Sequence, residues 1–142
     1  MSKKLKSVRS QPLLAVHDVL ASSRWYAKLL DLQLLADTKE DTHGNVYNRL
    51  LSDDTLILQL HSWEDEQHPN PVGEGDAKHG HGVLVWFEVD DFDIAVSRAR
   101  SIDAEIIQEP LVNPGPRHRE MWLRDPDGYV VVNASCDGEA HS

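Results

Sequence analysis

The chain contains the same order of sequence features twice, and this repeat limits its possible folds more than any other property. Val16 and Asp18 recur as Val89 and Asp91, a spacing of 73 residues in both cases. Each pair follows an apolar run and precedes a stretch with helical spacing. A repeat of this kind sets the topology before any local assignment is made. We therefore expect a fold built from two copies of one module.

Each copy has the pattern βαβββ. Asp18 and Asp91 are suited to begin helices, because a carboxylate accepts hydrogen bonds from the free amides of a first turn. The expected helices cover about 20–30 and 92–102, with apolar stripes that mark their core faces. Three runs of strand type follow each helix, at about 32–37, 46–51 and 55–61, then about 104–108, 120–124 and 129–134.

The last two runs are joined by the segment DPDG, residues 125–128. Pro126 fixes φ at the second turn position and Gly128 can adopt the left-handed conformation, so a tight hairpin is expected. The polar segment at about 62–82 is rich in proline and glycine and is expected to be a linker. The sequence thus predicts a single domain, 1–142, with module one at about 11–61 and module two at about 83–135.

Composition excludes several classes of protein. A chain of 142 residues fits one domain, and its net charge of −10 would repel the phosphates of nucleic acids. The longest apolar run, 83–87, is far shorter than the ~20 residues that span a bilayer, and the basic start has no signal-like apolar region. Cys136 is the single cysteine, so no intrachain disulfide can form. We expect a cytoplasmic protein that binds neither nucleic acid nor membrane.

Two βαβββ modules with VHDVLASSRWYAKLLDL at 16–32 and LRDPDGYVVV at 123–132 resemble the vicinal oxygen chelate superfamily. That superfamily includes glyoxalase I, bleomycin-resistance proteins and extradiol dioxygenases. The resemblance extends from Gln11 to Ser135 and implies an α+β fold, in which the modules form a curved, cup-shaped mixed sheet with helices outside. Asp31 stands where the family usually has glycine, so a differently shaped turn is expected there.

The resemblance also implies where metal-dependent members hold a divalent ion, namely at four inward positions of the first and last strands. In this chain those positions fall on Gln11, Gln59, Leu84 and Val132. A divalent ion needs carboxylate or imidazole ligands. Because leucine and valine have no lone pair to offer, we expect no metal at these positions and no other cofactor.

Strand alternation and the family resemblance together predict the remaining residues of the cup. The expected ligand-binding residues are Gln11, Tyr47, Arg49, Gln59, His61, Trp86, Glu88, Glu120 and Trp122. Aromatic walls with a few polar groups are typical of small-molecule pockets. Indole faces beside carboxylates favour a planar or cationic compound.

Three classes of function remain open. The first is a metal-free protein that sequesters a small molecule. The second is a lyase, isomerase or dioxygenase-like enzyme that uses His61, His118 and Glu120 as a relocated divalent metal site or as acid and base. The third is an interaction module whose cup is filled by its own side chains. His79 and His81 lie in the linker, where an exposed loop is favoured over a metal clip.

The resemblance also implies a homodimer. Related two-module chains complete their cups by placing module one of one chain against module two of the other, which also covers exposed strand edges. A small-molecule ligand and a second copy of the chain are therefore the expected partners.

Overall fold

The repeat predicted from the sequence is present in the order of the elements. The computed structural model describes residues 5–7, 9–35, 47–62 and 83–140. The elements are β1 (Leu13–Val16), α1 (Val19–Leu30), β2 (Gln33–Leu35), β3 (Tyr47–Ser52), β4 (Thr55–Ser62), β5 (Val85–Glu88), α2 (Phe92–Ser101), β6 (Glu105–Asn113), β7 (His118–Arg124) and β8 (Val130–Ala134). This is βαβββ twice, so the predicted α+β class with two modules is confirmed. The linker histidines His79 and His81 lie outside the described residues.

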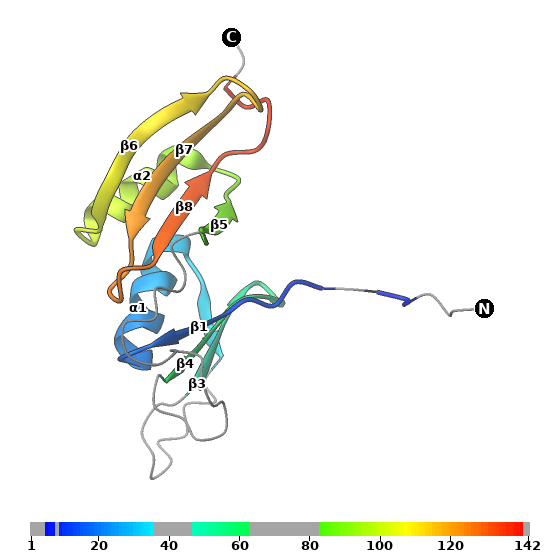
Figure 1. Cartoon of the computed structure of the whole chain (residues 1–142), viewed down its shortest axis with the longest axis vertical. Helices are drawn as coiled ribbons and strands as arrows, with labels where there is room; N and C mark the ends of the chain where they lie inside the picture. The colour runs from blue at the N-terminus through cyan, green and yellow to red at the C-terminus, as the bar shows by residue number, and fades with distance from the viewer. Residues whose placement is uncertain (1–4, 8, 36–46, 63–82, 141–142) are drawn as a thin grey trace.

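Each module forms one mixed sheet of four strands. The strand order is β1-β4-β3-β2 in the first sheet and β5-β8-β7-β6 in the second. In both sheets the first and last strands of the module pair in parallel, and the other pairs are antiparallel. Figure 1 shows each sheet with its own helix. The sheets are separate units within the chain, and β1 and β5 are edge strands.

The expected N-caps begin both helices. The side chain of Asp18 accepts a hydrogen bond from the amide of Ala21 at 2.9 Å, and that of Asp91 accepts one from Ile94 at 3.1 Å. Helix α1 ends at Asp31, which adopts the left-handed conformation with φ 55°. The expectation of a differently shaped turn is wrong here, because aspartate itself takes the conformation that glycine favours.

One hydrophobic core lies between the helices and the sheets. Its buried side chains include Tyr26 and Leu29 of α1, Phe92 and Ala99 of α2, and Leu50, Leu58, Leu60, Met121, Leu123 and Val131 of the strands. Helix α1 packs on its own sheet and on α2, which joins the cores of the two modules. No helix in the described part of the chain is long and apolar enough to cross a membrane.

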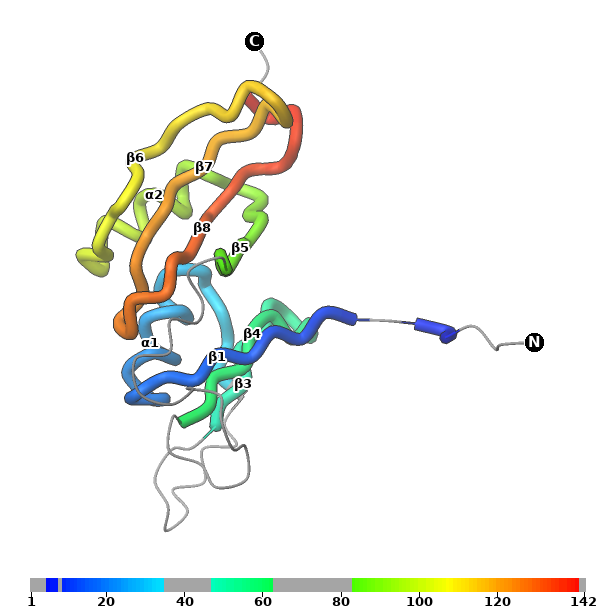
Figure 2. The backbone as a smooth tube through the Cα atoms, in the orientation of Figure 1, coloured from blue at the N-terminus to red at the C-terminus, as the bar shows by residue number. Residues whose placement is uncertain are grey.

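The DPDG hairpin does more than connect β7 to β8, because it also binds module two to module one. The hydroxyl of Tyr26 donates to Asp125 Oδ2 at 2.6 Å, and Ser22 Oγ donates to Asp127 Oδ2 at 3.2 Å. The amide of His17 donates to Asp127 Oδ1 at 2.9 Å. Figures 1 and 2 show the turn between β7 and β8 beside α1. Two carboxylates of one turn therefore fix the relative placement of the modules.

Strand β6 is longer than its predicted range of about 104–108. It continues to Asn113 through Pro110, with register shifts against β7 near Gln108. Proline is tolerated because β6 is an edge strand with one side free of partners. The longer pairing also begins β7 at His118, two residues before the predicted start.

Candidate ligand-binding site

The concave face of module two carries a row of two indoles with a valine between them. Trp86 of β5 and Trp122 of β7 both pair with Val132 of β8. Directly opposed residues point to the same face of a sheet, so these three side chains lie side by side. Val132 is fully buried, whereas Trp86 is 45% exposed. The position that would hold a metal ligand in metal-dependent relatives is therefore the apolar base of an aromatic row.

A second row places polar groups beside the indoles. Glu88 and Glu120 pair with Ala134 from its two sides. Glu120 Oε2 lies 2.6 Å from His118 Nε2, and Trp122 Nε1 donates to Glu120 Oε1 at 3.1 Å. The rings of Trp86 and His118 meet edge to face at 5.6 Å. The contacts thus unite four residues that strand alternation predicted on one face.

The contacts of His118 and Glu120 favour the charged form of each group. Burial by itself would lower the pKa of His118, but hydrogen bonds to Glu120 and to Asp137, whose Oδ1 lies 3.2 Å from Nδ1, outweigh it and raise that pKa. Burial likewise acts to raise the pKa of Glu120, but bonds from His118, Trp122 and Asn113 outweigh it and lower that pKa. The imidazole of His118 therefore lies between two carboxylates, and both contacts favour its protonated form.

Glu88 is the exposed carboxylate of this face, whereas Glu120 is buried against His118. It accepts a hydrogen bond from Cys136 Sγ at 3.1 Å, and this bond raises the pKa of the thiol. Cys136 is consequently less reactive than a free thiol.

Module one has a corresponding polar network. Tyr47 donates to Gln59 Oε1, and Gln59 Nε2 donates to the backbone carbonyl of Gln11 at 3.1 Å. Arg49 pairs with Gln59, and the rings of Tyr47 and His61 lie 6.0 Å apart. The predicted residues of this module therefore also share one face, with Gln11 in contact through its main chain.

These positions do not fit a divalent metal. Gln59 is held by Tyr47 and Gln11, Leu84 precedes β5, and Val132 is buried without a donor atom. Within the described residues, no three side chains of His, Cys, Asp or Glu are grouped to hold an ion. The donor chemistry disagrees with the metal sites of metal-dependent relatives.

The relocated set of His61, His118 and Glu120 is only partly assembled in one chain. His118 and Glu120 are hydrogen-bonded, but His61 belongs to the other sheet and has Tyr47 as its ring neighbour. Both ring nitrogens of His118 face carboxylates, at 2.6 and 3.2 Å. An imidazole held in this way has no nitrogen left to coordinate a metal.

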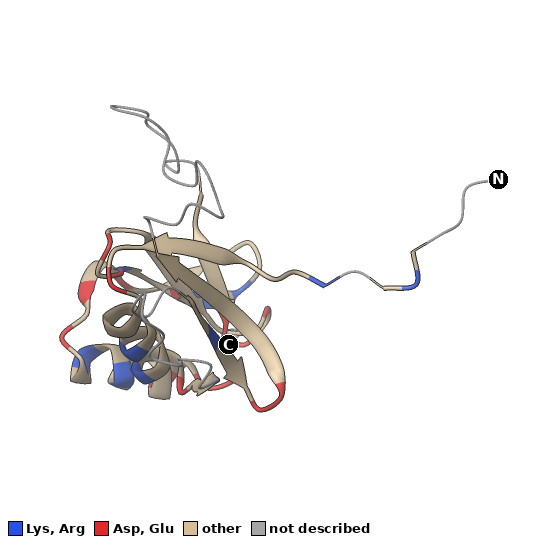
Figure 3. Ribbon diagram, turned by 90° about the horizontal axis from the view of Figure 1, so that it is seen from below, with Lys and Arg blue, Asp and Glu red and all other residues tan. Residues whose placement is uncertain are grey.

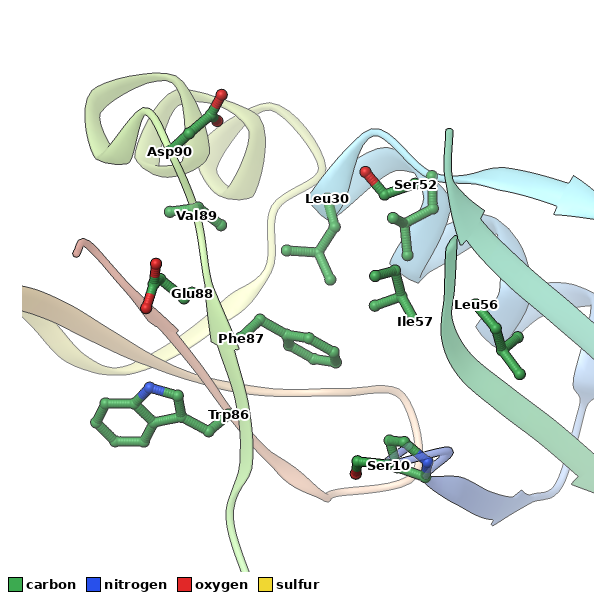
Figure 4. Close-up of a pocket in the computed structure, with 12 residues that line it drawn as sticks. Ser10, Leu30, Ser52, Leu56, Ile57, Trp86, Phe87, Glu88, Val89 and Asp90 are labelled. Atoms are coloured by element: carbon green, nitrogen blue, oxygen red, sulfur yellow. The ribbon is translucent and has the colours of Figure 1, made fainter. Parts of the chain in front are cut away.

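A cleft of about 550 Å³ lies between the modules (Figure 4). The ring of Phe87 points toward Ile57 and Leu30, whereas Trp86 and Glu88 point to the opposite side of β5. Trp86 and Glu88 nevertheless also line the cleft, so it adjoins the concave face along β5. Sequence patterns did not reveal it, because it depends on how the two modules are placed.

Asn113 and Asp137 also belong to this network, although neither was among the residues predicted from the sequence. Asn113 pairs with His118 across β6 and β7, and Asp137 follows the last strand. The extension of β6 beyond its predicted end is what brings Asn113 to this site. No local signal in the sequence marks either residue.

The family model of the Glyoxalase/Bleomycin resistance protein/Dioxygenase superfamily matches residues 8–132. The chain belongs to this superfamily. No curated protein matches its sequence significantly.

Solved structures show the same fold at low sequence identity. TioX from Micromonospora sp. ML1 is 17% identical, with a TM-score of 0.67 over 90% of this chain and 95% of that one. A glyoxalase/bleomycin resistance protein/dioxygenase family enzyme from Burkholderia phytofirmans PsJN is 18% identical, with a TM-score of 0.66 over 89% and 96% of the two chains. The fosfomycin resistance protein FosX from Mesorhizobium loti is 13% identical, with a TM-score of 0.59 over 93% of each.

Proposed function

We propose that this protein binds a planar, amphipathic small molecule on the concave face of module two, without a metal ion. The observation that carries the proposal is the row of Trp86, Val132 and Trp122. An apolar base with partly exposed indoles on both sides suits a flat ring system. The chemistry of metal-dependent relatives requires a Lewis acid, and the residues at those four positions supply no ligand set for one.

The polar groups favour a ligand that also carries a positive charge or hydrogen-bond donors. Glu88 is exposed beside Trp86 and makes a single described hydrogen bond, to a neutral thiol. Aromatic faces and a carboxylate both attract cations. Glu120 is buried and already hydrogen-bonded to His118, so the proposed contact of the cation is with Glu88.

The proposal includes a homodimer. Each concave face is one half of a cup, and β1 and β5 are edge strands. Module one of a second copy would place Tyr47, Gln59 and His61 opposite the indole row. A cytoplasmic location belongs to the same proposal. Sedimentation velocity at micromolar concentration should give the mass of two chains, and a monomer at high micromolar concentration would contradict this part.

Binding is tested by titrating the protein with planar cationic compounds, including bleomycin, and following tryptophan emission and calorimetric heat. Trp122→Ala should weaken binding at least tenfold and change the midpoint of thermal unfolding little, because a pocket wall contacts ligand more than protein. Val112→Ala, which shortens an exposed side chain on the opposite face of the same sheet, is the control and should bind like the wild type. A large loss of stability in Trp122→Ala, together with no binding by the wild type, would support a filled cup instead.

The second candidate function is catalysis, and the His118–Glu120 pair supports it. A histidine and a carboxylate in contact can exchange a proton with a ligand. In that case Glu120→Gln would abolish a turnover that the wild type shows. If Glu120→Gln changes ligand affinity alone, the binding function is supported.

A further inference from the structure

A groove of about 530 Å³ lies between α1 and α2, on the side of the molecule away from the concave faces. Its lining residues are Ala21, Arg24, Trp25 and Lys28 of α1, and Arg98, Ser101 and Ile102 at the end of α2. The four positions on α1 are spaced i, i+3, i+4 and i+7, so they form one helix face. The volume lies within the range of small-molecule sites.

This groove is basic although the protein is acidic. Three cations and no carboxylate line it, in a chain with a net charge of −10. Helix α1 contains Arg24 and Lys28 but no aspartate or glutamate. Figure 3 shows blue segments on the helices, and others on the strands and loops of the folded part.

Two of the cations are free within the described structure. The side chains of Arg24 and Lys28 are exposed and make no hydrogen bond or ion pair there. Other arginines of the protein are paired, for example Arg100 with Glu109 at 2.9 Å, and Arg119 with Asp93 at 2.9 Å. Like charges four residues apart on an exposed helix face repel only weakly in water, but an anion bound between them would interact favourably with both.

The third cation is held in place. Arg98 Nε donates to the carbonyl of Lys28 at 2.8 Å, and its NH2 group lies 3.4 Å from Asp31 Oδ1. A guanidinium has five N–H donors, so further donors remain for a ligand. Lys28 and Arg98 lie in the last turns of α1 and α2, where the helix dipole stabilises a positive charge. Arg24 lies in the middle of α1, so the helix dipole does not explain a cation at that position.

An indole adjoins these cations. Trp25 is half-buried, and its ring packs edge to face against Tyr26, with centroids 4.8 Å apart. This contact fixes the plane of the indole while part of it lines the groove. Arginine and lysine are the usual partners of phosphate groups, and an indole face is suited to a planar ring.

We propose that the groove between α1 and α2 binds a phosphorylated small molecule with a planar ring, such as a nucleoside phosphate. Its phosphates would contact Arg24, Lys28 and Arg98, and its ring would lie against Trp25. The site does not depend on the ligand of the concave face.

The test is isothermal titration calorimetry of the full-length protein with ATP, pyrophosphate and adenosine, in EDTA at low salt. ATP and pyrophosphate should bind with submillimolar Kd, and added salt should weaken both. The double variant Arg24→Gln, Lys28→Gln should bind at least tenfold more weakly. Trp25→Leu should weaken ATP but not pyrophosphate.

Lys6→Gln is the matched control, because Lys6 is an exposed cation on the N-terminal segment that extends away from both modules (Figure 2). It should change either Kd less than twofold. Absence of ATP and pyrophosphate binding at 10 mM would overturn the proposal, as would equal binding by the double variant. A poly-glutamate peptide that binds where ATP does not would assign the groove to an acidic protein and also overturn it. Thermal unfolding of each variant excludes misfolding, and the single variants replace the double one if its midpoint falls.

Discussion

His118 Nε2 lies 2.6 Å from Glu120 Oε2 on the concave face of β7, with both side chains buried. Paired charges of this kind are stabilised by each other and by further hydrogen bonds, here from Trp122 Nε1 to Glu120 and from His118 Nδ1 to Asp137. Removal of one partner leaves a buried charge without compensation, which is strongly unfavourable. The arrangement of these two side chains in the proposed site should therefore depend on pH.

Stability should depend on this pair most between about pH 4.5 and 6.5. The pKa of His118 is raised from 6.5, so its contribution is complete below that value and is lost as pH rises through the higher folded pKa. The pKa of Glu120 is lowered from 4.5, so its contribution is complete above that value and is lost as pH falls through the lower folded pKa. Thermal unfolding of wild type and His118→Gln from pH 3 to 9 should show the largest difference inside this window. Parallel curves would contradict an ionised pair.

Asn133→Leu should stabilise the protein by about 1–3 kcal/mol, the usual cost of a buried polar group without a partner. Asn133 is fully buried, and neither atom of its amide group has a hydrogen-bond partner among the described residues. Its counterpart in module one, 73 residues earlier, is the buried Leu60, which indicates that leucine fits this position. Urea unfolding measures the change.

Asn48→Leu is the control for that substitution. Asn48 is also buried, but its Nδ2 donates to Ser23 Oγ at 3.0 Å and its Oδ1 accepts from the amide of Arg49. The same change should therefore destabilise module one. A loss of stability in Asn133→Leu would indicate that Asn133 has a partner such as a buried water.

Tyr26→Phe should destabilise the protein by about 1–3 kcal/mol, because it leaves the buried Asp125 carboxylate short of one hydrogen bond. Tyr129→Phe removes the bond of a less buried hydroxyl to the carbonyl of Ala15 and should cost about 0.5–1.5 kcal/mol. Chemical denaturation of both variants measures the difference. Equal losses would show that the Tyr26–Asp125 bond contributes no more than the less buried bond of Tyr129.

Divalent metals should not stabilise this protein. A ligand that binds the folded state raises the midpoint of unfolding, so Zn²⁺, Mn²⁺ or Fe²⁺ at ten times the protein concentration should raise it by less than about 1 °C. Differential scanning fluorimetry with and without EDTA measures this. A chelator-sensitive increase that disappears in Glu120→Gln would instead support the relocated metal site.

Several features of the fold follow from short stretches of sequence. Asp18 and Asp91 cap their helices as predicted, since an N-cap needs a carboxylate and the next few amides alone. Strand alternation also put Glu120 and Trp122 on one face, because the direction of successive side chains is a local property. Prediction was weaker where pairing with a neighbour decides the outcome, as at the far end of β6.

The sequence by itself determined the repeat, the element order and the loss of metal-ligand chemistry at Leu84 and Val132, because these depend on local conformation and on the chemistry of single side chains. The tertiary structure decided which groups meet. It alone brings Asp137 to His118, places Asp127 of the DPDG turn against α1, and gathers cations between two helices. These contacts join residues from distant segments, and their distances are set by sheet register and module packing, which no local pattern encodes.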